Sequence, residues 1–578
     1  METLKSLRLL VILIVVQALF ISPHYTHASD SIDNGPKVYR IVMTIVTTSD
    51  WTTISSDGVE FLNSKITVLQ GDGSGLRVWH SGNKVGITKS PFNMTLVKAN
   101  ITLIINLTRC EGLTLKIQKG DIGYSYVRIV NINSETPVPV GEFNNSGSIQ
   151  NDSTNLREFP VSCEKIKQNG PLSLPSGDGI PKMVWAFYYP WYRAEQWDSD
   201  PALIDVPLLG KYSSSDPRAI RAHIKLAKAA GIDGFIVSWW GEGTYTDQNL
   251  KKILPIAAEE GFKVAIYLES LGGGGKPRPP NELKDMLRYF FRTYGSDERY
   301  FHLWGKPVIF VWAAGATPLE VWKEIFEDLR EEGYEGVYIA NTLNPKYLEV
   351  FDGLHTYATI NLDLRKVYPR AFIQCKTYPL LEETPKPRIW AATISPGYDD
   401  RHIPGREGHF QPRMDGKYYQ YTFKAAVDSN PDWLLITTFN EFPENTFIEP
   451  SRKYGFKYML MTANFTAAFK GTKPNITAVL ELKERWRLEE FEEKPPVETE
   501  SRTETKPSTT TQSPTTTTLP PSTTTSTASS HVHETTTSHS TESPGDGGEE
   551  TSATCGTGVF MLIVPLVRIF TKQRKKEL

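Results

Sequence analysis

The chain has 578 residues, and its 63 lysines and arginines against 66 aspartates and glutamates give a formal net charge of −3. A balance so near neutrality gives no support to a nucleic-acid partner or an anionic-membrane partner. Hydrophobic residues make up 39% of the chain, enough for packed cores, and four cysteines are too few for a disulfide scaffold. These values exclude a small secreted toxin, a multi-span membrane protein and a wholly disordered chain.

The amino terminus has the pattern of a secretory signal peptide. Lys5 and Arg8 precede an apolar run over residues 9–21, and small residues follow as far as Ala28. A charged segment, a short apolar segment and a cleavage site predict a signal peptide over residues 1–28. The alternative is an uncleaved membrane anchor.

Residues 36–165 predict an all-β domain. Short apolar or alternating runs are separated by Gly, Asn and Asp, and no long helical period appears. A β-sandwich is the natural class for such a segment. The runs cover residues 38–46, 76–80, 94–97, 101–107, 113–118 and 124–130.

Three features of this domain bear on its role. Cys110 and Cys163 could form a disulfide, although connectivity cannot be deduced from sequence and free thiols are equally compatible with it. Trp51 or Trp79 could bind a sugar ring; the alternative is a domain that serves only as a spacer or a docking unit. A cluster of Asn-x-Ser/Thr sequons in this domain favours a glycoprotein.

The next unit alternates strand-like and helical segments. A Gly/Pro/Ser-rich linker over residues 166–181 leads into residues 182–495, where near-continuous apolar runs indicate strands buried on both faces. Eight such strands alternating with amphipathic helices predict a (β/α)8 TIM-type barrel, whereas a doubly wound sheet lacks its GxGxxG motif here. The predicted strands are residues 183–189, 234–240, 263–269, 307–312, 336–341, 353–359, 388–395 and 433–441. The predicted helices are residues 217–231, 246–261, 281–294, 318–333 and 417–429.

The carboxyl-terminal part predicts a stalk and an anchor. Serine and threonine make up 27 of residues 501–550, so residues 496–554 cannot bury a core and form a disordered stalk, O-glycosylated or bare. Residues 556–570 are an apolar run that, although shorter than the ~20 residues of a typical span, predicts a membrane anchor, with a basic cytoplasmic tail at residues 571–578. Together with the signal peptide, this predicts a secreted protein held on the outer face of the cell membrane.

Aromatic and carboxylate side chains follow the predicted barrel strands. Barrels place their chemistry at the carboxyl ends of the strands, where aromatic rings suit the apolar faces of sugars and carboxylates suit their hydroxyl and acetal oxygens. We therefore predict a carbohydrate-binding site, although Trp239 and Trp240 could serve barrel packing and Glu269 could be paired to a neighbour. The candidates for substrate binding are Tyr189, Trp239, Trp240, Glu269, Trp312, Tyr357, Tyr398, Asp399 and Asn440.

Glu441 and Glu444, at the end of the eighth strand, are the best catalytic candidates. Two nearby carboxylates push their pKa values apart, so that one can be an acid and the other a base at the same pH, and glycoside hydrolysis uses such a pair. The alternative for two glutamates at this spacing is solvated surface charge. No metal-site spacing and no G-x-S-x-G elbow occurs, so the sequence predicts neither a metal nor another cofactor.

Several barrel segments resemble glycoside hydrolase family 99, the endo-α-mannosidases. The resemblance covers about residues 182–487 and leaves out the β-domain, the stalk and the anchor. The matching segments, in the order of the family, are residues 188–192 (YYPWY), 209–217 (LGKYSSSDP), 238–241 (SWWG), 396–399 (PGYD), 416–419 (GKYY) and 439–450 (FNEFPENTFIEP).

This resemblance implies retaining, endo-acting cleavage within an α-mannose-containing oligosaccharide or polysaccharide, without a metal. It implies that Glu441 helps deprotonate the substrate's own 2-hydroxyl, whose oxygen attacks the anomeric carbon and forms a 1,2-anhydro sugar. It implies that Glu444 protonates the leaving oxygen and later activates water. Asn440 and Tyr189 would position the sugar.

The chain departs from the family at three places. Residues 267–271 (YLESL) stand where the family commonly has His-x-Glu-Pro-Tyr, residues 312–315 (WAAG) where it has Tyr-Asp-Ser-Tyr, and Phe442-Pro443 where it has Trp-His. These departures leave the substrate less defined than the reaction. The rival hypothesis is a non-catalytic cell-surface glycan-binding protein, which the presence of both Glu441 and Glu444 disfavours.

Overall fold

The computed structural model describes most of two domains. The predicted signal peptide, stalk, anchor and basic tail, and residues 168–178 of the predicted linker, lie outside the described residues. Within the described part of the chain, no helix combines the length and apolar character needed to cross a membrane. The described residues are 38–47, 51–70, 76–89, 97–110, 114–119, 125–131, 138–145, 156–160, 163–167, 179–272 and 275–491.

The amino-terminal domain contains two five-stranded sheets that form a β-sandwich. In β6, Val97, Ala99, Ile101, Leu103 and Ile105 are fully buried and, as far as residue 103, alternate with more exposed residues, so one strand face lies in the core. The first sheet has the order β3 (Val59–Gln70), β6 (Val97–Leu107), β1 (Val38–Thr47), β8 (Ser125–Asn131) and β9 (Val138–Asn145). The second has the order β10 (Leu156–Pro160), β7 (Thr114–Lys119), β2 (Trp51–Ser55), β5 (Lys84–Lys89) and β4 (Leu76–Ser81).

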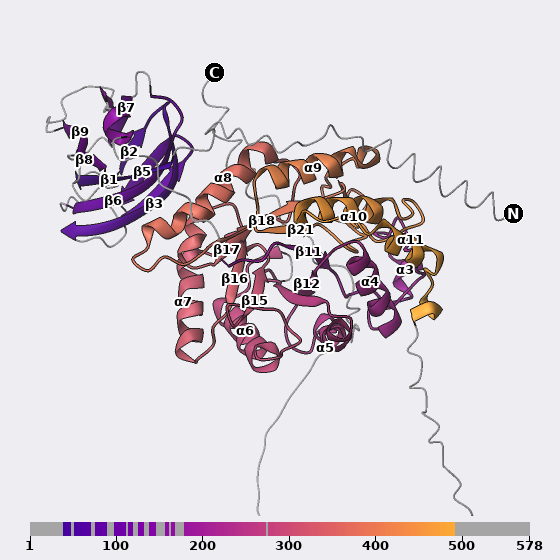
Figure 1. The fold of residues 1–578 in the computed structure, drawn as a ribbon. Coiled ribbons are helices and arrows are strands. Elements are labelled where there is room, and N and C mark those ends of the chain that lie inside the picture. Colours follow the sequence, from indigo (N-terminus) through magenta and orange to yellow (C-terminus); the bar gives the residue numbers. More distant parts are fainter. Residues whose placement is uncertain are drawn as a thin grey trace, which may run out of the picture.

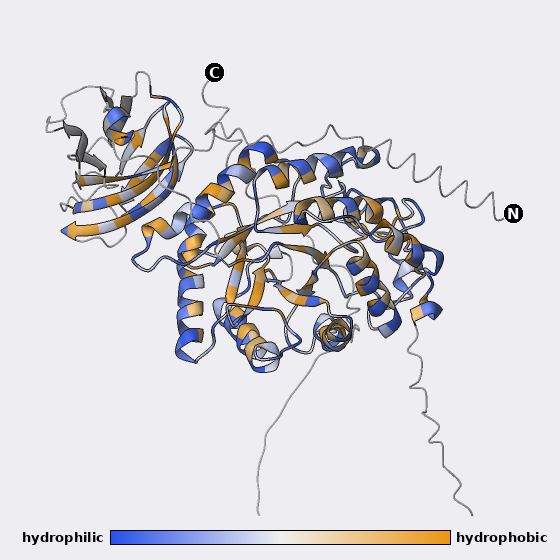
Figure 2. Cartoon of the chain, viewed as in Figure 1, coloured by the Kyte–Doolittle hydropathy of each residue, from blue (hydrophilic) through white to orange (hydrophobic). Residues whose placement is uncertain are grey.

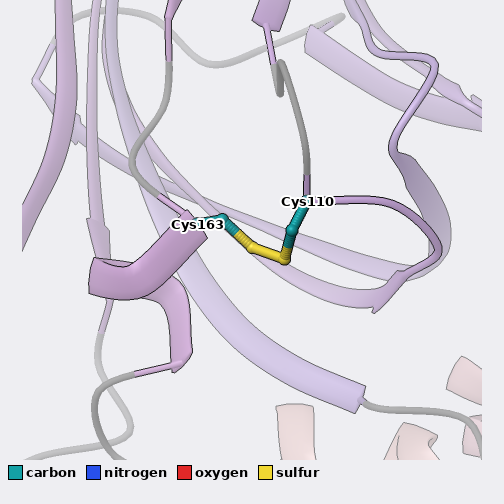
Figure 3. The surroundings of a disulfide bond; sticks show 2 residues. All are labelled: Cys110 and Cys163. Carbon is teal, nitrogen blue, oxygen red and sulfur yellow. A yellow bond between two sulfur atoms is a disulfide. The ribbon is translucent and has the colours of Figure 1, made fainter.

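A disulfide joins Cys110, which follows β6, to Cys163, the first residue of the short helix α2 (Cys163–Lys167) (Figure 3). The two residues are 53 positions apart in sequence and their Cα atoms lie 5.5 Å apart. The cross-link ties α2, the last described element of the domain, to the end of β6 in the first sheet. Cys375, in the barrel, is a buried free thiol.

Eight parallel strands form a closed barrel after the linker, which confirms the predicted TIM-type fold. Pairing of β13 with β15 closes the sheet, so a doubly wound open sheet is excluded. Figure 2 shows apolar residues concentrated on these strands and polar residues on the outer helix faces. The strands are β11 (Met183–Tyr188), β12 (Gly234–Trp239), β13 (Lys263–Leu268), β15 (Lys306–Val311), β16 (Val337–Asn341), β17 (Gly353–His355), β18 (Ile389–Ile394) and β21 (Trp433–Ile436).

Helices cover the outside of the barrel (Figure 1). The first of them shows why the sequence starts a helix there: the Asp216 side chain accepts from the Arg218 N–H at 2.9 Å and Pro217 occupies the first helical position. α8, α10 and α11 were not predicted. α8 contains Pro369, and α10 is apolar on most of its circumference. The main helices are α4 (Pro217–Ala229), α5 (Tyr245–Glu259), α6 (Pro280–Tyr294), α7 (Leu319–Glu331), α8 (Leu364–Thr377), α9 (Lys417–Asp428), α10 (Lys457–Lys470) and α11 (Ile476–Glu484).

The β-sandwich is fixed to the barrel through β3 and α8. Asn63, which is buried, donates from Nδ2 to the Gln374 carbonyl and to Thr377 Oγ1, both at 2.8 Å. Gln374 in turn donates to the Leu62 carbonyl at 2.8 Å, and Arg370 pairs with Glu60 at 3.0 Å. An apolar cluster lies beside these bonds, formed by Val38, Leu62, Ile104 and Leu381. The β-sandwich is therefore held against the barrel by direct contacts and not only by the linker.

We expect Asn63→Ala to lower the free energy of unfolding by about 1–3 kcal/mol, because it leaves the buried Gln374 carbonyl without this donor. Thermal unfolding of the full chain measures the change. The matched control is Asn83→Ala, an exposed asparagine in the β4–β5 turn, for which we expect a change within about 0.5 kcal/mol. Equal melting temperatures for the Asn63 variant and the parent would contradict this account of the interface.

Candidate active site

The segment after the eighth barrel strand crosses the carboxyl end of the barrel and is buried throughout residues 437–450. Its backbone is fixed locally, since the Glu441 N–H donates to Thr438 Oγ1 at 2.8 Å. Asn440 connects it to the first strand: its Oδ1 accepts from the Tyr189 N–H at 2.8 Å, and its Nδ2 donates to the Tyr189 carbonyl at 3.1 Å. These bonds set where Glu441 and Glu444 stand.

Glu444 is surrounded by hydrogen-bond donors. Tyr398 Oη lies 3.0 Å from Oε1, and Tyr357 Oη donates to Oε2 at 3.3 Å. The Arg406 Nη1 atom lies 3.3 Å from Oε1 and donates to Asp400 at 2.8 Å. Burial raises the pKa of Glu444 above its ordinary value; the Arg406 charge opposes this, the Asp400 charge adds to it, and the Tyr398 hydrogen bond opposes it. Every one of these donors stabilises the ionised form of Glu444.

Glu441 lies in surroundings that disfavour a negative charge on its carboxyl group more than those of Glu444 do. It is fully buried, and neither carboxylate oxygen has a hydrogen-bond partner among the described residues. Burial raises its pKa well above the ordinary value of 4.5, and the charge of Glu444 raises it further, opposed by Arg406. Between these two neighbouring carboxyl groups, the protein therefore favours the proton on Glu441 and the negative charge on Glu444.

Glu269, at the end of the third barrel strand, is a further buried carboxyl group near this pair. Ser238 Oγ donates to its Oε1 at 2.7 Å. Burial raises the pKa of Glu269 to about 8, with the Ser238 hydrogen bond and the Arg278 charge opposing the shift and the charge of Glu444 adding to it. The neighbour that pairs with the Glu269 carboxylate is therefore Ser238, whereas Arg278 donates to the Glu269 main-chain carbonyl at 2.8 Å.

Aromatic side chains surround these carboxyl groups. Tyr189 Oη donates to Tyr357 Oη at 2.9 Å, so the two tyrosines and Glu444 form one hydrogen-bonded chain. Trp312 packs edge-on against Tyr357, with ring centroids 5.0 Å apart, and remains partly exposed. Trp240, also partly exposed, donates from its indole nitrogen to Ser238 Oγ at 3.0 Å. The structure thus brings together eight of the predicted residues, namely Tyr189, Trp240, Glu269, Trp312, Tyr357, Tyr398, Glu441 and Glu444.

The predicted substrate contact of Trp239 is wrong. Successive residues of a strand point to opposite faces, and Ser238 points into the barrel toward Glu269. Trp239 therefore faces the helices: it is fully buried, its indole nitrogen donates to Asp247 of α5 at 3.0 Å, and its ring stacks near Tyr289 of α6. Its role is barrel packing.

Asp399 and Asn440 also need correction as substrate contacts. The partly buried Asp399 carboxylate accepts from the exposed Arg401 side chain at 2.8 and 2.9 Å. Its neighbour Asp400 is the residue that contacts Tyr398 and Arg406. The Asn440 side chain is engaged with the Tyr189 main chain, so it positions the segment instead of meeting a sugar.

Sequence reasoning missed three residues that complete the site: Asp400 and Arg413, which are buried, and Arg406, which is partly buried. Asp400 and Arg406 lie in the loop after the seventh barrel strand, where no spacing rule marks them. Arg413 is buried and donates from Nη2 to the carbonyls of Asn445 and Phe447 at 3.0 and 2.8 Å, directly after Glu444. Its guanidinium also lies 4.2 Å from the ring centre of Tyr454 and 4.3 Å from that of Tyr458. Arg413 thus holds the loop that carries Glu444.

In the described part of the chain, no group of three or more His, Cys, Asp and Glu side chains is arranged to hold a metal ion. The paired carboxyl groups can transfer protons, and the aromatic rings beside them can bind a sugar. This combination of residues is typical of a glycosidase active site.

Comparison with known proteins decides the family. The model of glycosyl hydrolase family 99 matches residues 200–461. The barrel belongs to glycosyl hydrolase family 99. It is accordingly a glycoside hydrolase domain, with Glu441 and Glu444 within the matched residues.

The similar proteins are named as endo-alpha-mannosidases or endo-alpha-mannosidase-like proteins. The chain is 25% identical over 356 residues to the glycoprotein endo-alpha-1,2-mannosidase of Mus musculus, covering 52% of this chain and 73% of that protein. It is 26% identical over 322 residues to a glycoprotein endo-alpha-1,2-mannosidase-like protein of Danio rerio, covering 46% and 70%. A solved family 99 endo-alpha-mannosidase from Bacteroides thetaiotaomicron, in complex with bis-tris-propane, has 28% identity and a TM-score of 0.45, covering 50% of this chain and 97% of that one.

Proposed function

We propose that this chain is a retaining, endo-acting glycoside hydrolase that cleaves internal α-mannosidic bonds, or closely related α-glycosidic bonds, of glycans. The observation that carries the proposal is the asymmetric pair in the family 99 barrel: among the residues that the structure describes, Glu444 has three donors and the Glu441 carboxylate has none. The names of the relatives, endo-alpha-1,2-mannosidases, support the substrate class.

In the first proposed step the substrate's own 2-hydroxyl is the nucleophile. Glu441, ionised in the reacting complex, accepts the proton of this hydroxyl, and its oxygen forms a bond to the anomeric carbon. The bond from that carbon to the glycosidic oxygen breaks, and Glu444 gives its proton to the departing oxygen. The products of the step are a shortened glycan and a 1,2-anhydro sugar.

The surroundings of the two carboxyl groups favour this direction of proton movement. As the bond breaks, Glu441 becomes neutral and Glu444 becomes negative. That is the charge distribution that the donors of Glu444 and the apolar burial of Glu441 stabilise. Stabilising charge where it develops, more than where it starts, lowers the barrier of the chemical step.

The second step returns the protons to their starting places. Ionised Glu444 accepts a proton from water, whose oxygen attacks the anomeric carbon, and Glu441 gives its proton back to the 2-oxygen. Two displacements at one carbon leave the anomeric configuration unchanged, which is why the proposal is for a retaining enzyme.

The proposal is tested by incubating the full chain with α-mannans and α-glucosyl-mannosides and reading the products by mass spectrometry. We expect release of intact oligosaccharides with a new reducing end. Release of single sugars would contradict the endo-acting mode. Binding of every glycan with no turnover of any would favour the rival, a non-catalytic glycan-binding protein.

The pH dependence of kcat/KM should respond to Arg406. The active form of the pair carries one proton, so activity is lost on the acid side when a second proton binds. The Arg406 guanidinium lowers the pKa of both Glu441 and Glu444. We therefore expect Arg406→Gln to move the acid limb of the profile to higher pH. Arg406→Lys, which keeps the charge, should move it less; an unchanged limb in the glutamine variant would contradict this electrostatic account.

We also propose that the enzyme acts outside the cell, held by the carboxyl-terminal anchor. Its support is the sequence of residues 1–28, 496–554 and 556–570 alone. Protease treatment of intact cells that express the full chain tests this. Degradation of the barrel domain is the expected result, and complete protection would contradict an outer-face location.

A further inference from the structure

The outer face of the second sheet of the β-sandwich carries two tryptophans. Ile54, Val78, Val85 and Ile87 of its strands are buried and form the inner face. Residues directly opposite on neighbouring strands share a face, so the register identifies the outer one. One row across the sheet is Trp51, Thr88 and Arg77, and the next is Thr53, Gly86 and Trp79.

The Trp79 ring lies over its strand neighbour Gly86. A Cβ atom added to Gly86 would stand 2.4 Å from two atoms of the Trp79 ring and 2.8 Å from its indole nitrogen. The indole therefore occupies the space directly above Gly86, where any larger residue would displace it. Trp79 nevertheless remains partly exposed, so part of the ring is open to a ligand.

Trp51 stands on the same face at a diagonal position. It lies two strands and two residues away from Trp79, which corresponds to about 12 Å in a regular sheet. The side chains around the two rings are polar: Thr53, Thr88, Arg77 and, on the adjoining strand, Gln118. Two indole rings with hydroxyl, amide and guanidinium groups on the same sheet face match the C–H faces and hydroxyls of a glycan chain.

We propose that Trp51 and Trp79 form a glycan-binding platform on the β-sandwich, distinct from the barrel site, that holds a neutral polysaccharide while the barrel cleaves it. The inference rests on the proposed function for the choice of glycan. Docking of the β-sandwich through Asn63 and Gln374 keeps the platform at a fixed position on the barrel. A second binding site in the same molecule raises the local concentration of a long substrate at the first. A short substrate that cannot reach both sites gains nothing.

Affinity electrophoresis through gels that contain α-mannan tests the platform without requiring turnover. The full chain carrying Glu441→Gln and Glu444→Gln serves as parent, so that the polymer stays intact. We expect α-mannan to retard the parent, and Trp51→Ala with Trp79→Ala to raise the apparent Kd by about tenfold, as loss of two aromatic contacts implies. The matched control is Trp304→Ala, which removes an exposed tryptophan from the β14 (His302–Leu303) to β15 turn.

Two outcomes would overturn the platform: a parent that α-mannan does not retard, or a double variant retarded as strongly as the parent. Trp79→Ala also removes the side chain that packs over Gly86. The single variant Trp51→Ala therefore repeats the test in a chain that keeps the Trp79–Gly86 contact. In the catalytically intact chain, both tryptophan changes should raise KM for α-mannan and leave hydrolysis of a short oligosaccharide unchanged. Retardation through these tryptophans in a chain that hydrolyses no glycan would refute the proposed function and leave the platform standing.

Discussion

Glu444→Gln will reduce the hydrolysis of glycans with a sugar leaving group by about 10³-fold, the range that loss of a general acid typically costs. A glutamine keeps the size of the side chain and can still contact Tyr398 and Tyr357, but it has no proton to give to the glycosidic oxygen. The loss should appear in kcat, because the change removes an interaction that matters as the bond breaks.

The leaving group supplies the sharpest control for this prediction. A glycosyl fluoride needs no protonation to depart, so release of fluoride in the first turnover should be far less affected than release of a sugar. Glu242→Gln is the matched variant, since Glu242 lies after the second barrel strand and is exposed. Equal losses with fluoride and sugar leaving groups would show that Glu444 is not the acid.

Glu441→Gln will reduce hydrolysis by about 10³-fold or more with either leaving group, because activation of the 2-hydroxyl is needed whatever departs. Comparison of the same two substrates with both variants thus separates the two roles. A glutamine variant at Glu441 that regains activity with the fluoride would contradict its assignment as the base.

The same variant should be more stable than the parent. A carboxyl group whose pKa is raised in the folded state is ionised more easily in the unfolded state, so it destabilises the fold as pH rises above 4.5. Glutamine removes this cost. We expect a higher melting temperature for Glu441→Gln at neutral pH, with the difference shrinking as pH falls toward 4.5 and below. A parent that is as stable as the variant at neutral pH would show that Glu441 is not a strained, buried acid.

The barrel could be predicted because its strands are buried on both faces and therefore appear in the sequence as apolar runs. β11 and β12, each buried at all six positions, are the clearest cases. α10 was not predicted because it is buried on most sides. Such a helix has no polar face, so its sequence lacks the alternation of polar and apolar residues that identifies a surface helix.

The site was predictable where it follows strand ends and not where it depends on loops. Glu441, Glu444, Glu269 and Tyr357 all stand just beyond barrel strands, where chemistry is expected. Arg406 reaches Glu444 from a loop, and only the folded chain shows that contact. Trp239 was misassigned although the alternation of side chains along β12 places it opposite to Ser238.

The most direct test of the account is the configuration of the first-formed product, followed by proton NMR from the start of the reaction with an α-linked mannan oligosaccharide. The proposed roles of Glu441 and Glu444 predict that the new reducing end appears as the α-anomer and only later equilibrates. Appearance of the β-anomer first would mean a single displacement by water, and would contradict attack by the 2-hydroxyl and the assignment of the two carboxyl groups.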